Sequence, residues 1–140
     1  MARAYLTRRV TFAAAHRYRR PEWDDERNSA VFGLCARPNY HGHTYTCDVT
    51  LGGEVDALTG FIIDLGALDR VLADEVRGRY DHRNINLDVP EFAEGLLIPT
   101  GENLARVIFS QLQRALGSTA TVVEVRLAED DALSATYRGE

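Results

Sequence analysis

One strict alternation of side chains constrains the fold of this chain more than any other feature. From Thr44 to Gly52 apolar residues fill every second position, and threonines or an aspartate stand between them. Successive side chains of a strand point to opposite faces, so this pattern predicts a strand with one buried and one exposed face. The chain is therefore expected to contain a sheet that is covered on one side.

The other segments predict further strands and two helices. Asp64 and Thr100 are helix-capping residues, and apolar side chains follow each at helical spacing, up to about Tyr80 and up to Gly117. The expected strands are residues 5–16, 44–52, 61–63, 121–127 and 132–137, and the expected loops are 17–28, with a short irregular helix as the alternative, and 84–99. Strands and helices do not alternate one by one, which favours an α+β fold with helices on one face of an antiparallel sheet.

Composition narrows the class of protein. The 140 residues suggest a single domain, 1–140, with a net charge of -5. That charge argues against nucleic-acid and anionic-membrane partners, although the arginines of residues 17–20 can receive a polyanionic substrate locally. No apolar run of about 18 residues, as a membrane-spanning helix needs, and no signal peptide is visible. Two cysteines make no disulfide framework, so we expect a cytoplasmic protein.

The chain also lacks the motifs of several common enzyme classes. It contains no lysine, which excludes a lysine Schiff base and the standard phosphate-binding P-loop. It contains no GxGxxG stretch and no GxSxG elbow, so neither a dinucleotide-binding unit nor a serine hydrolase is supported.

Two histidines stand at the start of the alternating strand. His41 and His43 are two residues apart, so a strand points both imidazoles to the same face. Such a pair can bind one metal ion, and His16, at the end of the first expected strand, is a natural third ligand. Ordinary strand or turn histidines remain an equal alternative from the spacing alone.

The two cysteines differ in their surroundings. Cys47 lies on the apolar side of the alternating strand, as a buried structural cysteine would. Cys35 lies in a turn-like stretch, where a metal or Arg37 would lower the thiol pKa and favour a nucleophile or general base.

Three further positions have ordinary structural explanations. His82, after Asp81, can interact with the end of a helix or form a proton relay with that carboxylate. Glu102 can stabilise the first turn of its helix, and Glu129 can be part of a solvated turn between two strands.

Taken together, these segments resemble the 6-pyruvoyltetrahydropterin synthase family, which also contains the 6-carboxytetrahydropterin synthases. The resemblance covers nearly the whole chain. It rests on an ordered set of short motifs: FAAAH at 12–16, FGLC at 32–35, HGHTY at 41–45, TGF at 59–61, Asp64, DHRN at 81–84, PTGEN at 99–103 and the hairpin 129–140.

The resemblance implies a tunnelling fold, in which a four-stranded antiparallel sheet carries two helices on one face. It implies a homohexamer whose active sites lie between subunits. It also assigns roles to residues: His16, His41 and His43 bind zinc, Cys35 is the general base, Asp81 and His82 are its relay partners, and Glu129 holds the pterin with Thr100 and Glu102.

The family substrate is 7,8-dihydroneopterin triphosphate. The resemblance implies that zinc acidifies its side-chain hydroxyls, a base removes a proton, and triphosphate leaves. Five residues separate Cys35 from His41, as in the pyruvoyl branch, so we expect 6-pyruvoyltetrahydropterin as product and tetrahydrobiopterin-type biosynthesis. The alternatives are 6-carboxytetrahydropterin synthesis for queuosine and related deazapurines, and a non-catalytic zinc- or pterin-binding oligomer.

Overall fold

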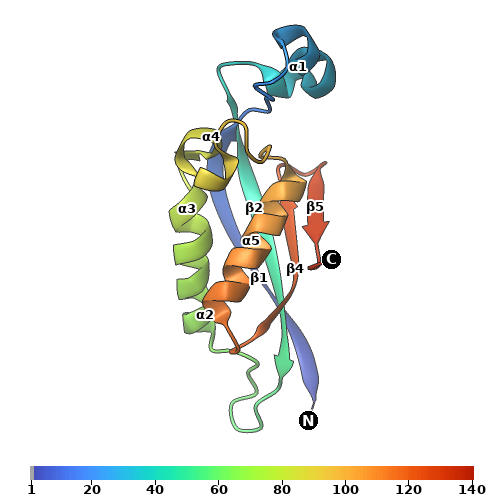
Figure 1. Ribbon diagram of the computed structural model, residues 1–140. Coiled ribbons are helices and arrows are strands. Elements are labelled where there is room, and N and C mark those ends of the chain that lie inside the picture. Colours follow the sequence, from blue (N-terminus) through green and yellow to red (C-terminus); the bar gives the residue numbers. More distant parts are fainter. Residues whose placement is uncertain (1) are drawn as a thin grey trace.

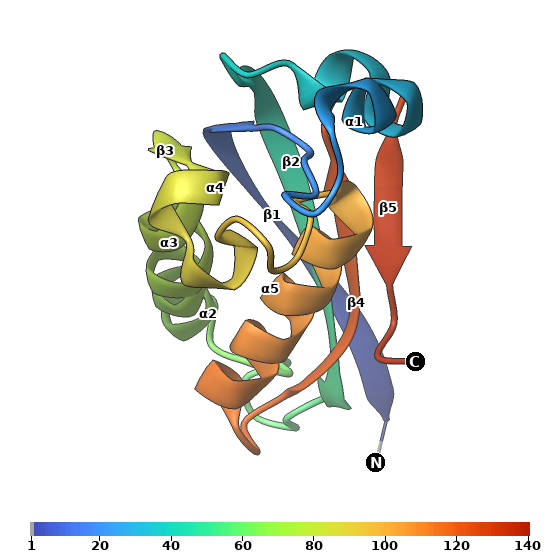
Figure 2. The same ribbon diagram turned by 45° about the horizontal axis from the view of Figure 1, so that its top comes forward.

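Five strands form one sheet in the computed structural model, which describes residues 2–140 (Figures 1 and 2). The strands lie in the order β3-β1-β2-β4-β5. Their bounds are β1 (Arg3–His16), β2 (His41–Glu54), β3 (Arg83–Asn84), β4 (Thr121–Ala128) and β5 (Ser134–Tyr137). The α+β class is as expected.

The expected four-stranded antiparallel sheet is wrong in one respect, because β3 adds a fifth strand parallel to β1. The cause is a short turn that docks on the free edge of β1. The amide of His82 donates to the carbonyl of Ala13 at 2.6 Å, and the amide of Ala13 donates to Asp81 Oδ1 at 2.9 Å. After these bonds the two residues of β3 pair with β1 in parallel, so the sheet contains both parallel and antiparallel strands.

The two long strands pair over their whole length. β1 and β2 are antiparallel from Arg3↔Glu54 to His16↔His41. The even residues of β1 and the odd residues of β2 face the helices, so Phe12 lies opposite Tyr45 with ring centroids 4.9 Å apart. The alternation seen in the sequence therefore defines the buried face.

Helices cover that face in two ridges that lie side by side, with the chain running in opposite directions along them (Figures 1 and 2). One ridge is a continuous run of α2 (Leu65–Leu72), η2 (Ala73–Arg77), which is a π-helical turn, and α3 (Gly78–Tyr80). The other is α5 (Gly101–Leu116). Asp64 and Thr100 cap their first turns as expected, accepting hydrogen bonds from the third residue beyond each.

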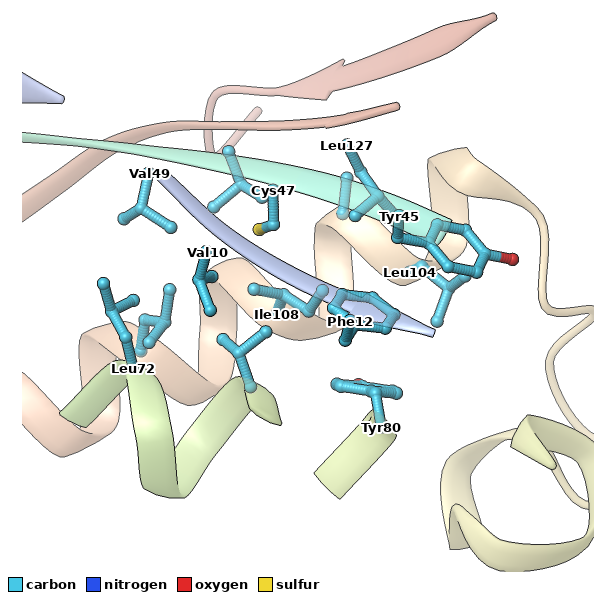
Figure 3. Packing of buried hydrophobic residues seen from close by; sticks show 14 of the residues in the cluster. Val10, Phe12, Tyr45, Cys47, Val49, Leu72, Tyr80, Leu104, Ile108 and Leu127 are labelled. Atoms are coloured by element: carbon cyan, nitrogen blue, oxygen red, sulfur yellow. The ribbon is translucent and has the colours of Figure 1, made fainter. Parts of the chain in front are cut away.

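Side chains from both ridges meet the sheet in one apolar core (Figure 3). Leu72 and Tyr80 from the first ridge, and Leu104 and Ile108 from α5, are almost completely buried against the strands. Two long helical elements on one face of the sheet are thus confirmed. None of the helices within residues 2–140 is both long and apolar enough to cross a membrane.

Two of the expected strands differ from the structure. Residues 61–63 form no strand, because Asp56 Oδ1 accepts the amides of Leu58 and Thr59 and closes a tight turn before them. The last strand begins at Ser134 instead of residue 132, because the amides of Ala132 and Leu133 donate hydrogen bonds to Asp130 Oδ1 and are held in a turn.

The expected loops also contain regular structure. Four short helices occupy or adjoin them: α1 (Asp25–Phe32), η1 (Gly33–Ala36), α4 (Ile85–Asp88) and η3 (Pro90–Phe92). Asp24 caps α1 by accepting from the amide of Arg27 at 2.8 Å. The alternative of a short helix near residues 17–28 was therefore closer to the structure than a plain loop.

Candidate active site

Three histidines meet at one end of the sheet. His16 ends β1, while His41 and His43 begin β2, and the register pairs His16 with His41 and Ala14 with His43. Strand alternation points all three side chains to the same face. One nitrogen from each lies within 4.8 Å of the other two, and the Nε2 atoms of His16 and His41 are 3.1 Å apart.

The chemistry of this cluster fits a zinc ion. The Pro99 carbonyl can only accept a hydrogen bond, so His16 Nδ1, 3.0 Å away, carries the proton and Nε2 keeps its lone pair. His43 Nε2 is buried and has no hydrogen-bond partner within residues 2–140. Three imidazole nitrogens with one open position are the ligand set of catalytic zinc.

The surroundings of His16 and His41 favour the neutral imidazole, which is the form that binds a metal ion. Burial, followed by the nearby His41 and His43, lowers the pKa of His16 to about 3. Burial and the adjacent His43 lower the pKa of His41 as well. At neutral pH these two rings therefore offer lone pairs to a cation.

A buried carboxylate stands next to the cluster. Glu129, at the end of β4, is only 9% exposed, with its oxygens 4.0 Å from His16 Nε2 and 3.8 Å from His43 Nε2. The hydroxyl of Tyr18 donates to Glu129 Oε1 at 3.2 Å. Burial, and then the charge of Glu129, raise the pKa of Tyr18, so this hydroxyl stays protonated as a donor.

Tyr18 was not among the residues expected at the site. Its position two residues after His16 could have predicted it, because in a chain that continues in extended form the side chains of residues 16 and 18 point to the same face. The polar stretch around it concealed that signal.

The three residues expected to bind substrate line one pocket. Thr100 and Glu102 at the start of α5 and Glu129 border a space of about 250 Å³, which Tyr18 and Ser134 of β5 also line. Residues 100 and 129 come together because α5 packs against β4 and β5 (Figure 2). The pocket therefore offers a buried carboxylate and a helix start to a polar ligand.

Cys35 lies on the same side of the molecule, in η1. Its carbonyl accepts from the amide of Tyr18 at 2.8 Å, which ties the cysteine to the segment beside the histidines. The thiol is partly buried. Burial and the charge of Glu129 raise its pKa, so within the chain alone Arg37 does not produce the lowered value considered from the sequence.

Asp81 and His82 form a pair at the outer edge of β1. Asp81 Oδ2 lies 3.1 Å from His82 Nδ1 and 3.1 Å from Arg77 Nη2. The positive φ of His82, 59°, folds these adjacent side chains together. Within residues 2–140 neither side chain forms a hydrogen bond or an ion pair with Cys35, and His82 is 85% exposed.

Comparisons with known proteins identify sequences similar to this chain. Residues 5–140 match the family model of 6-pyruvoyl tetrahydropterin synthase. The 6-pyruvoyl tetrahydrobiopterin synthase of Homo sapiens is 36% identical over 137 residues, which cover 98% of this chain and 92% of that protein. The 6-carboxy-5,6,7,8-tetrahydropterin synthase of Bacillus subtilis is 32% identical over 111 residues, covering 76% and 71%.

A solved structure extends the similarity to three dimensions. The 6-pyruvoyl tetrahydropterin synthase of Caenorhabditis elegans superposes with a TM-score of 0.93 at 32% identity, covering 100% of this chain and 98% of that one. With the family model matching almost the whole sequence, this chain belongs to the 6-pyruvoyl tetrahydropterin synthase family.

Proposed function

We propose that this chain is a zinc-dependent lyase that converts 7,8-dihydroneopterin triphosphate to 6-pyruvoyltetrahydropterin and triphosphate. The observation that carries the proposal is the meeting of three histidine nitrogens within 4.8 Å of one another, beside the buried carboxylate of Glu129. The similar proteins named as 6-pyruvoyl tetrahydrobiopterin synthases, which this chain covers almost completely, support the same reaction.

His16, His41 and His43 are the proposed zinc ligands. Bound zinc supplies a Lewis acid that acidifies the hydroxyl and C–H groups of the substrate side chain. The protein holds the imidazole rings in place. The Pro99 carbonyl accepts a hydrogen bond from His16 Nδ1, and the β1–β2 register places His41 opposite His16.

Glu129 is the proposed anchor of the pterin ring. A pterin presents N–H donors along one edge, and an ionised carboxylate accepts such bonds about twice as strongly as a neutral group. Glu129 already accepts from Tyr18 and has further lone pairs to offer. Thr100 and Glu102, which line the same pocket, would position the rest of the ring.

Cys35 is the proposed base that removes the side-chain proton, after which triphosphate leaves and internal redox completes the product. Its raised pKa means that it needs a cation or a proton acceptor close by. Asp81 and His82 would provide the relay from a neighbouring subunit of a homohexamer. His82 is exposed and forms no hydrogen bond with Cys35 within residues 2–140, which supports that arrangement.

Product identification tests the reaction and separates its closest alternative. The purified protein is incubated with dihydroneopterin triphosphate, and the pterin product is identified by mass spectrometry. A 6-pyruvoyl product is expected; 6-carboxytetrahydropterin with released acetaldehyde would instead assign the activity that names the Bacillus subtilis relative.

Two cysteine variants test catalysis against simple binding. Cys35→Ala should stop triphosphate release while zinc content stays at the wild-type level. Cys47→Ala removes a thiol that is fully buried in the core, so it serves as the matched control and should retain activity. Full triphosphate release by Cys35→Ala would leave the thiol without a catalytic role.

A further inference from the structure

An arginine-lined groove lies beside the candidate active site. Arg17, Arg19 and Arg37 border a space of about 430 Å³, and the hydroxyl-bearing Ser29 of α1 lies on its wall. Arg17 and Arg19 also border an adjoining pocket of about 110 Å³ that reaches Tyr40. Three guanidinium groups around one space form a local positive site in a protein of net charge -5.

Hydrogen bonds hold both the backbone and the side chain of Arg17 in place. The side chain of Asn86 clamps its backbone from both sides, accepting from the Arg17 amide at 2.9 Å and donating to the Arg17 carbonyl at 3.0 Å. Its Nη2 donates to the carbonyl of Ala36 at 3.2 Å. Its Nε is buried and has no partner within residues 2–140. A fixed guanidinium with an unused donor is suited to binding an anion.

The three arginines differ in the charges that face them. Arg19 is paired with Asp25 at 2.8 Å and lies 3.8 Å from Glu94, both exposed carboxylates. Arg17 and Arg37 form no ion pair in the described part of the chain, residues 2–140. An incoming anion would therefore meet two unpaired guanidinium groups, and it would compete with Asp25 and Glu94 only for Arg19.

The groove adjoins the residues that carry the proposed reaction. Arg17 follows His16 in the chain, Tyr40 precedes His41, and Ala36 follows Cys35. Between the two arginines, Tyr18 turns to the other side and donates to Glu129 in the pterin pocket. In residues 17–19, Tyr18 therefore contacts the proposed pterin pocket while Arg17 and Arg19 line the groove. The histidine cluster begins one residue earlier, at His16.

We propose that this groove binds the triphosphate chain of the substrate, with Arg17 and Arg37 as its main contacts. The inference rests on the proposed function, since it assigns a place to the leaving group of that reaction. Arginine is the side chain best suited to phosphate oxygens, because its planar fork donates two parallel hydrogen bonds.

Calorimetric titration with inorganic triphosphate tests the groove without requiring turnover. Arg17→Gln and Arg37→Gln should each weaken binding of triphosphate by roughly tenfold or more, as expected on losing a charge-assisted contact. Arg37 is exposed in a turn, so its variant will fold even if Arg17→Gln does not. Arg70→Gln, an exposed arginine on α2 far along the chain, is the control with the same charge change and should bind like wild type.

Two further measurements separate this inference from the proposed function. Arg37→Gln should raise the KM for dihydroneopterin triphosphate more than it lowers kcat, while binding of phosphate-free dihydroneopterin stays the same. Equal triphosphate affinity in wild type and both groove variants would overturn the inference, even if the wild type is an active lyase. Arginine-dependent triphosphate binding in a protein that does not turn the substrate over would support the groove and refute the reaction.

Discussion

The buried amide of Asn28 organises the segment that carries the groove and Tyr18. Asn28 is only 1% exposed, although it lies in α1 on the surface of the fold. Its Oδ1 accepts from the Arg20 amide at 2.8 Å. Its Nδ2 lies within hydrogen-bonding distance of the carbonyls of Arg20, Trp23 and Asp24, at 3.1, 3.3 and 3.0 Å. Asn28→Ala removes all of these bonds at once.

The cost of this substitution can be worked out from the bonds. A hydrogen bond contributes about 0.5–1.5 kcal/mol net, and a buried group left without a partner costs more. Of the three Nδ2 contacts, an amide NH₂ can satisfy two well, because it has two hydrogens. With the Oδ1 bond this makes three effective hydrogen bonds, so Asn28→Ala should lower the free energy of unfolding by about 2–4 kcal/mol.

Asn28→Asp is a sharper test of the same reasoning. It keeps the oxygen that accepts from Arg20 but places a carboxylate oxygen against three carbonyls. It should destabilise at least as much as alanine at pH 7, and protonation of the carboxylate in acid should reduce the difference from wild type.

Urea unfolding followed by circular dichroism measures these changes, with Asn39→Ala as control because Asn39 is an exposed turn residue. The control should change the free energy of unfolding by less than about 0.5 kcal/mol. A comparably small effect of Asn28→Ala, or a wild-type stability of Asn28→Asp at pH 7, would refute the hydrogen-bond account. Inorganic triphosphate binding should weaken in Asn28→Ala, since the arginine segment loses its anchor.

Three other outcomes follow from the structure. His41→Ala should reduce zinc content from about one per chain to near zero by metal analysis, because a three-ligand site loses one ligand. The metal-free protein should lose stability as the pH falls from 6.5 towards 3, because over that range His16 binds a proton only in the unfolded chain. Urea unfolding midpoints at successive pH values measure this loss, and midpoints that do not change with pH would contradict it. Ile108→Ala should cost about 2–5 kcal/mol in urea unfolding without changing zinc content, since Ile108 is fully buried in the core.

The long elements could be predicted because each follows a strong local pattern. Alternation identified β1, β2 and β4, and the caps Asp64 and Thr100 located the starts of both helical ridges. The histidine cluster followed from the same alternation once two strands were assumed to pair. Its confirmation required only the register, which joins His16 to His41.

The errors occur where side chains bind the backbone. Asp56 and Asp130 close turns that shorten or replace expected strands, and Asp81 attaches a fifth strand to β1. Asn28 and Asn86 hold distant segments by their amides. None of these contacts has a periodicity, so hydrophobic patterns cannot show them.

The histidine cluster of the candidate active site continues the register of the core. Phe12 and Tyr45 stack in the core, and the next core-facing positions along the pair are Ala14 opposite His43, then His16 opposite His41. A slip of one residue between the strands would expose the core side chains and turn the histidines of one strand to the other face. Packing of the apolar face therefore also holds the ligand atoms within 4.8 Å of one another. Substitutions in the middle of β1 or β2 that preserve the register should leave the proposed zinc site intact, even when they reduce stability.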